Sequence, residues 1–351
     1  MPFYASLKSV EPGRRARIVN GLKSLRAAFR SGPQAIPAKT ANDTLLLATW
    51  NIREFDSGKY GWRDQECYHY IAEIIDRFDL VAIQEVRESL YALQRVRQLL
   101  GPSWDYLVTD VTLGRSGNSE RMAFLYDRRK IEFTGLAAEL VLPKETAGAD
   151  APIQFARSPY ISGFRAGWAY LTLVTVHIYY GESIAVDPRR LAEIEQLGRT
   201  IARSAGGFSA ANVYEPGGKP SRDNLILLGD FNIFNRDDVT MEALTKAGFR
   251  VPDELQSIPG SNVGKDKHYD QIAYYKTLQA LKPTGRAGVF DPFECVFREA
   301  DAALYDGDRA AKPGRSFRDW RTYRLSDHLP MWVEFSIDDS DAYLDRLTAT
   351  S

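Results

Sequence analysis

The stretch Leu225–Asn232 reads LILLGDFN, and it indicates both a strand and a site. Its apolar first part predicts a short strand over Leu225–Gly229. Asp230 and Asn232 follow where that strand stops. A strand that ends at such groups presents them at an edge of its sheet. Alone, the pattern is more typical of a hydrogen-bonded core residue or of a helix cap than of a site.

The same arrangement recurs along the chain, which makes a functional site the better interpretation. Asn51 follows LLLATW, Glu85 follows LVAIQ and His177 follows LTLVTV, while Asp327 and His328 stand directly before LPMWVEF. Polar groups placed repeatedly at the ends of apolar strands favour one shared site over several unrelated core residues.

The remaining pattern mixes strands with helices without strict alternation. Helices are predicted over 64–78, 88–100, 188–205 and 238–247, and further strands over 104–109, 121–126, 130–136, 155–164, 168–179, 269–275 and 331–336. This order favours packed mixed sheets with helices outside them, an α/β (α+β) fold in one domain.

Charge is distributed unevenly over the 351 residues, although the net charge is only −1. Residues 1–40 carry +7, so the rest of the chain carries −8. We therefore divide the chain into a basic N-terminal helical arm (1–42), a main domain (43–339) and a C-terminal tail (340–351). The arm contains an amphipathic helix over 13–30, which packs on the body, contacts a nucleic acid or a membrane surface, or forms an unpacked tail.

Composition excludes several classes of protein. Apolar residues make up 44% and charged residues 26%, which argues against a disordered chain. Cys67 and Cys295 are too few for a disulfide framework. No apolar run is long enough to span a membrane, and the N-terminus lacks the apolar core of a signal peptide, so we expect a cytoplasmic protein.

The residue types at the strand ends limit the chemistry. Asparagine and carboxylate oxygens are ligands for Mg²⁺, with Mn²⁺ or Ca²⁺ as alternatives, whereas the sequence shows no zinc spacing. Neither a GxSxG nucleophile elbow nor a Walker loop is present. The pattern is typical of metal-assisted hydrolysis, most naturally of a phosphate ester.

A family resemblance rests on seven motifs. They are WNIR (50–53), QEVR (84–87), LGR (113–115) with Glu120-Arg121, TVH (175–177), GDFN (229–232), YDQI (269–272) and SDHLP (326–330). In this order they resemble the endonuclease/exonuclease/phosphatase superfamily, and most closely its deoxyribonuclease I branch. The resemblance covers about residues 44–337, and it implies a four-layer sandwich of two packed mixed β-sheets flanked by helices.

The resemblance also implies a role for individual residues. Asn51 and Glu85 would hold the divalent metal, with Asp327 as a second carboxylate on the metal side. Asp230 and Asn232 would position the attacking water and contact the scissile phosphate.

Two histidines complete the implied catalytic set. His328 would be oriented by Asp270, and His177 by Glu120. Either histidine could be the acid or the base. Arg157 would contact phosphate.

Further arginines are candidates for DNA contact. Arg53 and Arg87 would bind phosphates, or else form surface salt bridges. Arginine or lysine also recurs every third residue from Arg309 to Arg324, with aromatic residues at 317, 320 and 323. Arg315, Arg318 and Arg321 are therefore candidates for backbone contact, and the aromatic residues for stacking. The alternative is a solvated face whose aromatic residues lie in the core.

The leading hypothesis is an Mg²⁺-dependent phosphodiesterase that hydrolyses DNA as an endonuclease. A second hypothesis keeps the chemistry and changes the substrate to a phospholipid, an inositol phosphate or another small phosphoester. A third is a non-catalytic binding protein on the same fold.

Overall fold

Two six-stranded sheets form the centre of the molecule. The computed structural model describes residues 1–55, 57–112, 118–142, 154–204, 224–276, 278–310 and 314–349. Sheet A has the strand order β11-β12-β1-β2-β4-β3, and sheet B the order β5-β6-β7-β8-β10-β9. Both sheets contain parallel and antiparallel pairs, so the mixed sheets predicted from the sequence are confirmed.

The bounds of the elements are as follows. Sheet A contains β1 (Thr44–Phe55), β2 (Leu80–Arg87), β3 (Trp104–Val108), β4 (Glu120–Asp127), β11 (Lys282–Val289) and β12 (Met331–Ser336). Sheet B contains β5 (Ile131–Glu139), β6 (Tyr160–Ala166), β7 (Ala169–His177), β8 (Asn224–Asp230), β9 (Phe249–Arg250) and β10 (Asp270–Tyr275). The α-helices are α1 (Pro12–Arg30), α2 (Gln65–Ile75), α3 (Tyr91–Leu100), α4 (Pro188–Ser204), α5 (Val239–Lys246), α6 (Asp253–Gln256), α7 (Asp306–Ala310), α8 (Phe317–Thr322) and α9 (Ser340–Ala349).

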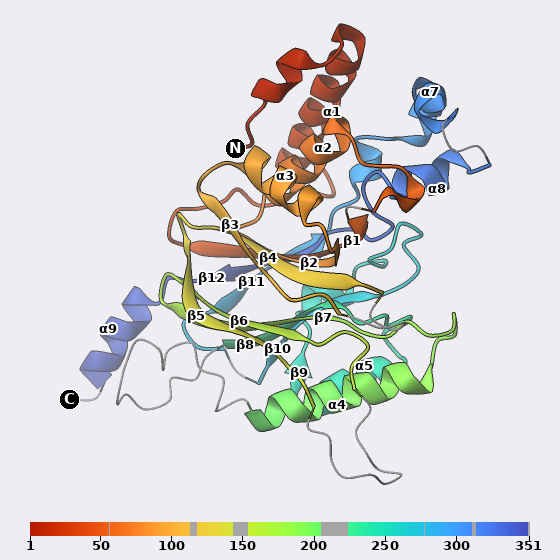
Figure 1. Cartoon of the computed structure of the whole chain (residues 1–351). Helices are drawn as coiled ribbons and strands as arrows, with labels where there is room; N and C mark the ends of the chain where they lie inside the picture. The colour runs from red at the N-terminus through yellow and green to blue at the C-terminus, as the bar shows by residue number, and fades with distance from the viewer. Residues whose placement is uncertain are drawn as a thin grey trace.

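The layers follow from side-chain alternation along the strands. In β1, Leu45 and Leu47 lie in the core between the sheets, whereas Leu46 and Trp50 pack under α1, α2 and α3. Successive side chains of a strand point to opposite faces, so an apolar run can bury both faces. Helices α4 and α5 cover the outer face of sheet B, which gives four layers (Figure 1).

Antiparallel pairing explains how residues at strand starts join residues at strand ends. The last residue of β8, Asp230, lies opposite His177 at the end of the parallel β7 and opposite Asp270 at the start of the antiparallel β10. In sheet A, Arg87 lies opposite Glu120 in the same way. One edge of each sheet therefore collects the polar groups that the sequence scatters.

The N-terminal helix packs on the body. Helix α1 begins and ends close to the predicted helix 13–30, and its residues Ile18, Leu22, Leu25 and Phe29 are buried. Arg17 and Arg26 of α1 bond Glu66 and Glu73 of α2. These contacts fit the packed-helix alternative, because the two arginines are occupied by carboxylates of the body.

Several regular elements fall where the sequence predicts none, among them β9, β11, α6, α7 and α9. Strand β11 has an exposed first half, since it is the edge of sheet A, and so it lacks a strong apolar pattern. Helix α9 lies within the predicted tail. The LGR motif (113–115), the predicted loop 206–223 and Lys312 fall outside the described residues. No helix among the described residues is long and apolar enough to cross a membrane.

Candidate active site

A cleft of about 350 Å³ opens where the polar edges of the two sheets meet. Sheet A and its loops contribute Arg53, Glu54, Tyr60, Glu85, Asn118, Glu120, Tyr323, Asp327 and His328, and sheet B and its loops contribute Arg157, His177, Tyr180, Asp230, Asn232 and Tyr269. These fifteen residues come from many separate strands and loops, so local structure alone cannot bring them together. Their convergence is the result of the two-sheet packing.

Asp230 lies at the centre of the polar groups. Its Oδ2 accepts a hydrogen bond from Asn51 Nδ2 at 2.9 Å, and its Oδ1 accepts one from the backbone N–H of Asn232 at 2.9 Å. The Asn232 amide is itself fixed, because its Nδ2 donates to the carbonyl of Ile178. The carboxylate is therefore held in one orientation.

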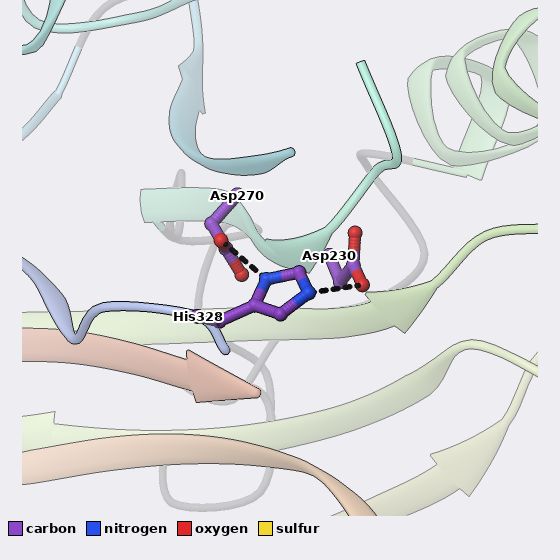
Figure 2. Close-up of side chains that lie close together, drawn as sticks. All are labelled: Asp230, Asp270 and His328. Carbon is purple, nitrogen blue, oxygen red and sulfur yellow. Dashed lines mark hydrogen bonds and ion pairs between the residues drawn. The ribbon is translucent and has the colours of Figure 1, made fainter. Parts of the chain in front are cut away.

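His328 connects two carboxylates. Its Nδ1 lies 2.8 Å from Asp270 Oδ2, and its Nε2 lies 3.8 Å from Asp230 Oδ2 (Figure 2). Burial opposes a charge on this imidazole, but Asp270 and Asp230 outweigh burial and raise the pKa of His328 well above its ordinary value. The pairing with Asp270 predicted from the resemblance is present in the structure, and it favours the imidazolium form.

His177 is placed by a second carboxylate. Its Nδ1 lies 3.1 Å from Glu120 Oε2, and its Nε2 lies 3.5 Å from Asp230 Oδ2. Arg157 Nε donates to the same Glu120 oxygen at 2.6 Å. Although burial works in the opposite direction, His177 and Arg157 lower the pKa of Glu120 to about 2, so this carboxylate stays ionised.

The residues proposed to hold a metal fit a hard cation. Asn51 Oδ1 is buried and has no hydrogen-bond partner among the described residues, which leaves an oxygen for a ligand. Burial, together with the negative charges of Glu120 and Asp327, raises the pKa of Glu85. A divalent cation bound here would neutralise the excess negative charge and would take the amide oxygen as a ligand.

A local distortion directs Glu85 into the cleft. By alternation, residue 85 shares a face with Val81 and Ile83, which pack under the helices. The pairing of β2 with β4 shifts register between Ile83 and Val86, and Glu85 has φ 60°. Bulges of this kind re-aim side chains beside active sites. A carboxylate oxygen of Glu85 accepts from the backbone N–H of Glu54 at 2.7 Å, which holds the side chain there.

A cluster of possible metal ligands, Asp230, Asp270 and His328, also lies together, with its ligand atoms within 4.8 Å of one another. Both imidazole nitrogens of His328 face carboxylates in it, and the imidazole favours its protonated form. A protonated imidazole cannot ligate a metal, so His328 could serve as a ligand only in its neutral form. The cluster and the pair Asn51 and Glu85 are therefore two candidate sets of cation ligands in this region.

Four of the predicted arginines lie at or near the cleft. Arg53 and Arg157 line it. Arg87 pairs with Glu54 at 3.1 Å and donates to the carbonyl of Asn118, so it supports the wall of the cleft. Arg315 reaches the same wall through Tyr60 and Tyr323, with its Cζ 4.5 and 4.7 Å from the two ring centres.

The structure does not bring Arg321 to the cleft. Its guanidinium is buried, donates to the carbonyl of Phe297 at 3.1 Å and lies over the ring of Phe293. Residues three apart lie on nearly the same side of a helix, so the three-residue period could not show that Arg321 is buried against other elements. Arg318, by contrast, is exposed.

Sequence reasoning missed several residues of the cleft wall. Tyr60 and Tyr180 line it, yet neither belongs to one of the seven motifs. Two buried arginines, Arg63 and Arg324, support this wall through hydrogen bonds to backbone carbonyls. Arg63 donates to the carbonyls of Arg53, Glu54, Arg324 and Leu325. Arg324 donates to those of Tyr60, Gly61 and Trp62. Neither arginine belongs to one of the seven motifs, and the burial of their charged groups is not visible in the sequence.

Comparisons with known proteins agree with this geometry. Residues 48–328 match the sequence model of the Endonuclease/Exonuclease/phosphatase family. A deoxyribonuclease of Thioalkalivibrio sp. (strain K90mix) is 30% identical over 296 residues, which are 83% of this chain and 71% of that protein.

Two solved structures share the fold at low identity. The human Nocturnin catalytic domain has a TM-score of 0.54 and 14% identity, over 84% of this chain and 94% of that one. A mannosyl-6-phosphatase of Bacteroides thetaiotaomicron has a TM-score of 0.51 and 17% identity, over 83% of this chain and 99% of that one.

Proposed function

Because the chain belongs to the Endonuclease/Exonuclease/phosphatase family, we propose that it is a Mg²⁺-dependent phosphodiesterase that cleaves DNA internally. Enzymes of this family generally depend on a divalent metal. The similarity to a deoxyribonuclease over 83% of the chain supports DNA as the substrate. The observation that carries the proposal is the placement of two carboxylate-bound histidines around one fixed aspartate, Asp230.

The proton transfers follow from the contacts of these groups. The Asp230 carboxylate, held by Asn51 and Asn232, accepts the proton of the attacking water. As the water oxygen bonds to phosphorus, the bond to the leaving oxygen breaks. Asp270 holds Nδ1 of His328, so Nε2 is left to donate a proton to the phosphate or to the leaving oxygen.

The second histidine and the arginine neutralise charge on the phosphate. His177 faces Asp230 through Nε2, and Glu120 holds its other nitrogen. Arg157 is fixed at the same carboxylate and presents its remaining N–H groups to the cleft. Donors fixed before the reaction stabilise developing charge at little reorganisation cost. A cation bound by Asn51 and Glu85, with Asp327 nearby, would supply further stabilisation of the phosphoryl and leaving oxygens.

Plasmid nicking tests the proposal directly. Purified protein is incubated with supercoiled plasmid and Mg²⁺ or Mn²⁺, with and without EDTA. We expect open circles from the wild type, none in EDTA, and a large loss for His177→Ala and His328→Ala. Wild-type protein that does not nick, or variants that nick at the wild-type rate, would contradict it.

A substrate panel separates DNA from other phosphoesters. It contains plasmid, linear DNA, RNA, bis-p-nitrophenyl phosphate and sphingomyelin. Turnover confined to the lipid or to the small diester would exclude DNA and retain the hydrolase. Mg²⁺ binding without turnover on any member would instead indicate a binding protein.

A further inference from the structure

We propose that Tyr60, supported from behind by Tyr323, forms a nucleobase-stacking subsite on one wall of the cleft, which receives an unpaired base beside the scissile phosphate. The inference rests on the proposed function and deepens it, because it makes single-stranded or locally opened DNA the preferred substrate. A base can stack on a protein ring only after it has left its own stack.

The two rings stack on each other, and Tyr323 is only 6% exposed, so the ring that a base can reach is that of the half-buried Tyr60. The ring centroids are 3.9 Å apart with an interplanar angle of 23°, and both residues line the same cleft as His328 and Asp230.

Positive charge surrounds the rings. Arg53 Cζ lies 3.9 Å from the centre of the Tyr323 ring, and Arg315 Cζ lies 4.5 Å from that of Tyr60. Both arginines share Asp319 as an ion partner, at 3.7 and 3.0 Å, and its side chain is 43% exposed. An exposed ion pair is worth little, so a phosphate can replace the carboxylate at small cost. Aromatic rings flanked by cations match a base and its adjacent phosphate.

The subsite is held rigid by a reciprocal arginine clamp. Arg63 donates to the carbonyls of Arg324 and Leu325, and Arg324 donates to those of Tyr60, Gly61 and Trp62. Each guanidinium thus bonds the loop that carries the other. Since one loop bears Tyr60 and the other Tyr323, the clamp fixes the two rings against each other. A preorganised surface loses little entropy when a ligand binds.

Binding of two matched oligonucleotides tests the subsite. One is a fluorescein-labelled thymidylate dodecamer, and the other has the same backbone and charge but reduced abasic residues. Affinities are measured by anisotropy in EDTA, which stops hydrolysis. We expect the wild type to bind the thymidylate about 10-fold more tightly, and Tyr60→Leu and Tyr323→Leu each to reduce that ratio severalfold.

Tyr343→Leu is the matched control, because Tyr343 is also a partly exposed tyrosine with an arginine, Arg346, over its ring. It should leave the ratio unchanged. Tyr60 is only half-buried, so its substitution tests the subsite even where Tyr323→Leu impairs folding. Equal wild-type affinity for the two probes, or a ratio that survives both substitutions, would overturn the subsite.

The same measurements separate this inference from the proposed function. Protein that nicks plasmid yet binds both probes equally is a nuclease without the subsite. Protein that binds neither probe and does not nick plasmid, yet hydrolyses bis-p-nitrophenyl phosphate, is a phosphodiesterase for which both DNA and the subsite are excluded.

Discussion

His177 and His328 face the same carboxylate oxygen, Asp230 Oδ2, at 3.5 and 3.8 Å from their Nε2 atoms. His177 belongs to β7 of sheet B, whereas His328 precedes β12 of sheet A. The two sheets thus contribute one imidazole each to a single carboxylate. Groups arranged in this way act as a unit.

The first prediction follows from this shared partner. His177→Ala and His328→Ala should each lower kcat by about 10²–10⁴-fold. The double variant should lose little more than the worse single variant, because removal of either histidine already disables the unit. Steady-state kinetics on bis-p-nitrophenyl phosphate measure all three. Strictly multiplicative losses would show instead that the histidines act independently.

The second prediction concerns the cation. Asn51→Ala and Glu85→Gln should weaken Mg²⁺ binding by about 10-fold or more, because each removes an oxygen ligand or its charge. Calorimetric titration with Mg²⁺, together with the rise in Tm on adding Mg²⁺, measures binding without relying on turnover. Glu88→Gln is the control, since Glu88 lies three residues further on and is exposed. Unchanged affinity in Glu85→Gln would remove this residue from the metal site.

The third prediction concerns acid stability. His69 is fully buried, and burial lowers its pKa from 6.5 to about 4. Between these values the unfolded chain takes up the proton more readily than the folded one. The free energy of unfolding should therefore be highest above pH 6.5 and fall by up to about 3 kcal/mol as the pH approaches 4.

A variant isolates this contribution from the other titrating groups. His69→Gln keeps a polar side chain near Ser6, whose Oγ lies 3.0 Å from His69 Nε2. Urea denaturation at pH 7, 5.5 and 4 should show a flatter dependence on pH for the variant than for the wild type. The same slope in both proteins would contradict the prediction.

The fourth prediction concerns the arginine clamp. Arg63→Lys and Arg324→Lys should each lower the free energy of unfolding by about 2–3 kcal/mol, because one ammonium cannot reach the carbonyls that a guanidinium bonds. Chemical denaturation measures the change. Arg318→Lys, at an exposed position of the neighbouring helix α8, should stay within about 0.5 kcal/mol of the wild type. A clamp variant as stable as Arg318→Lys would show that these hydrogen bonds contribute little.

Local sequence patterns determined the catalytic residue types and most of the elements of this protein. The run Leu225–Asn232 contains its own strand and its own polar end, so β8 and Asp230 were predictable from eight residues. The seven motifs were sufficient for the family as well. Information of this kind is local, because alternation and strand ends depend on neighbouring residues.

Tertiary structure alone decided which groups meet and how they point. Antiparallel pairing placed Asp270 opposite Asp230, and a register shift with a positive φ turned Glu85 into the cleft. Packing also separated Arg321, which is buried against Phe297, from Arg53, which lines the cleft. The wall of Tyr60 and Tyr323 joins residues 263 positions apart through stacking of the two rings and through arginine hydrogen bonds to backbone carbonyls. Such contacts depend on the relative position of two loops in space, and the residues next to each loop in the sequence do not determine that position.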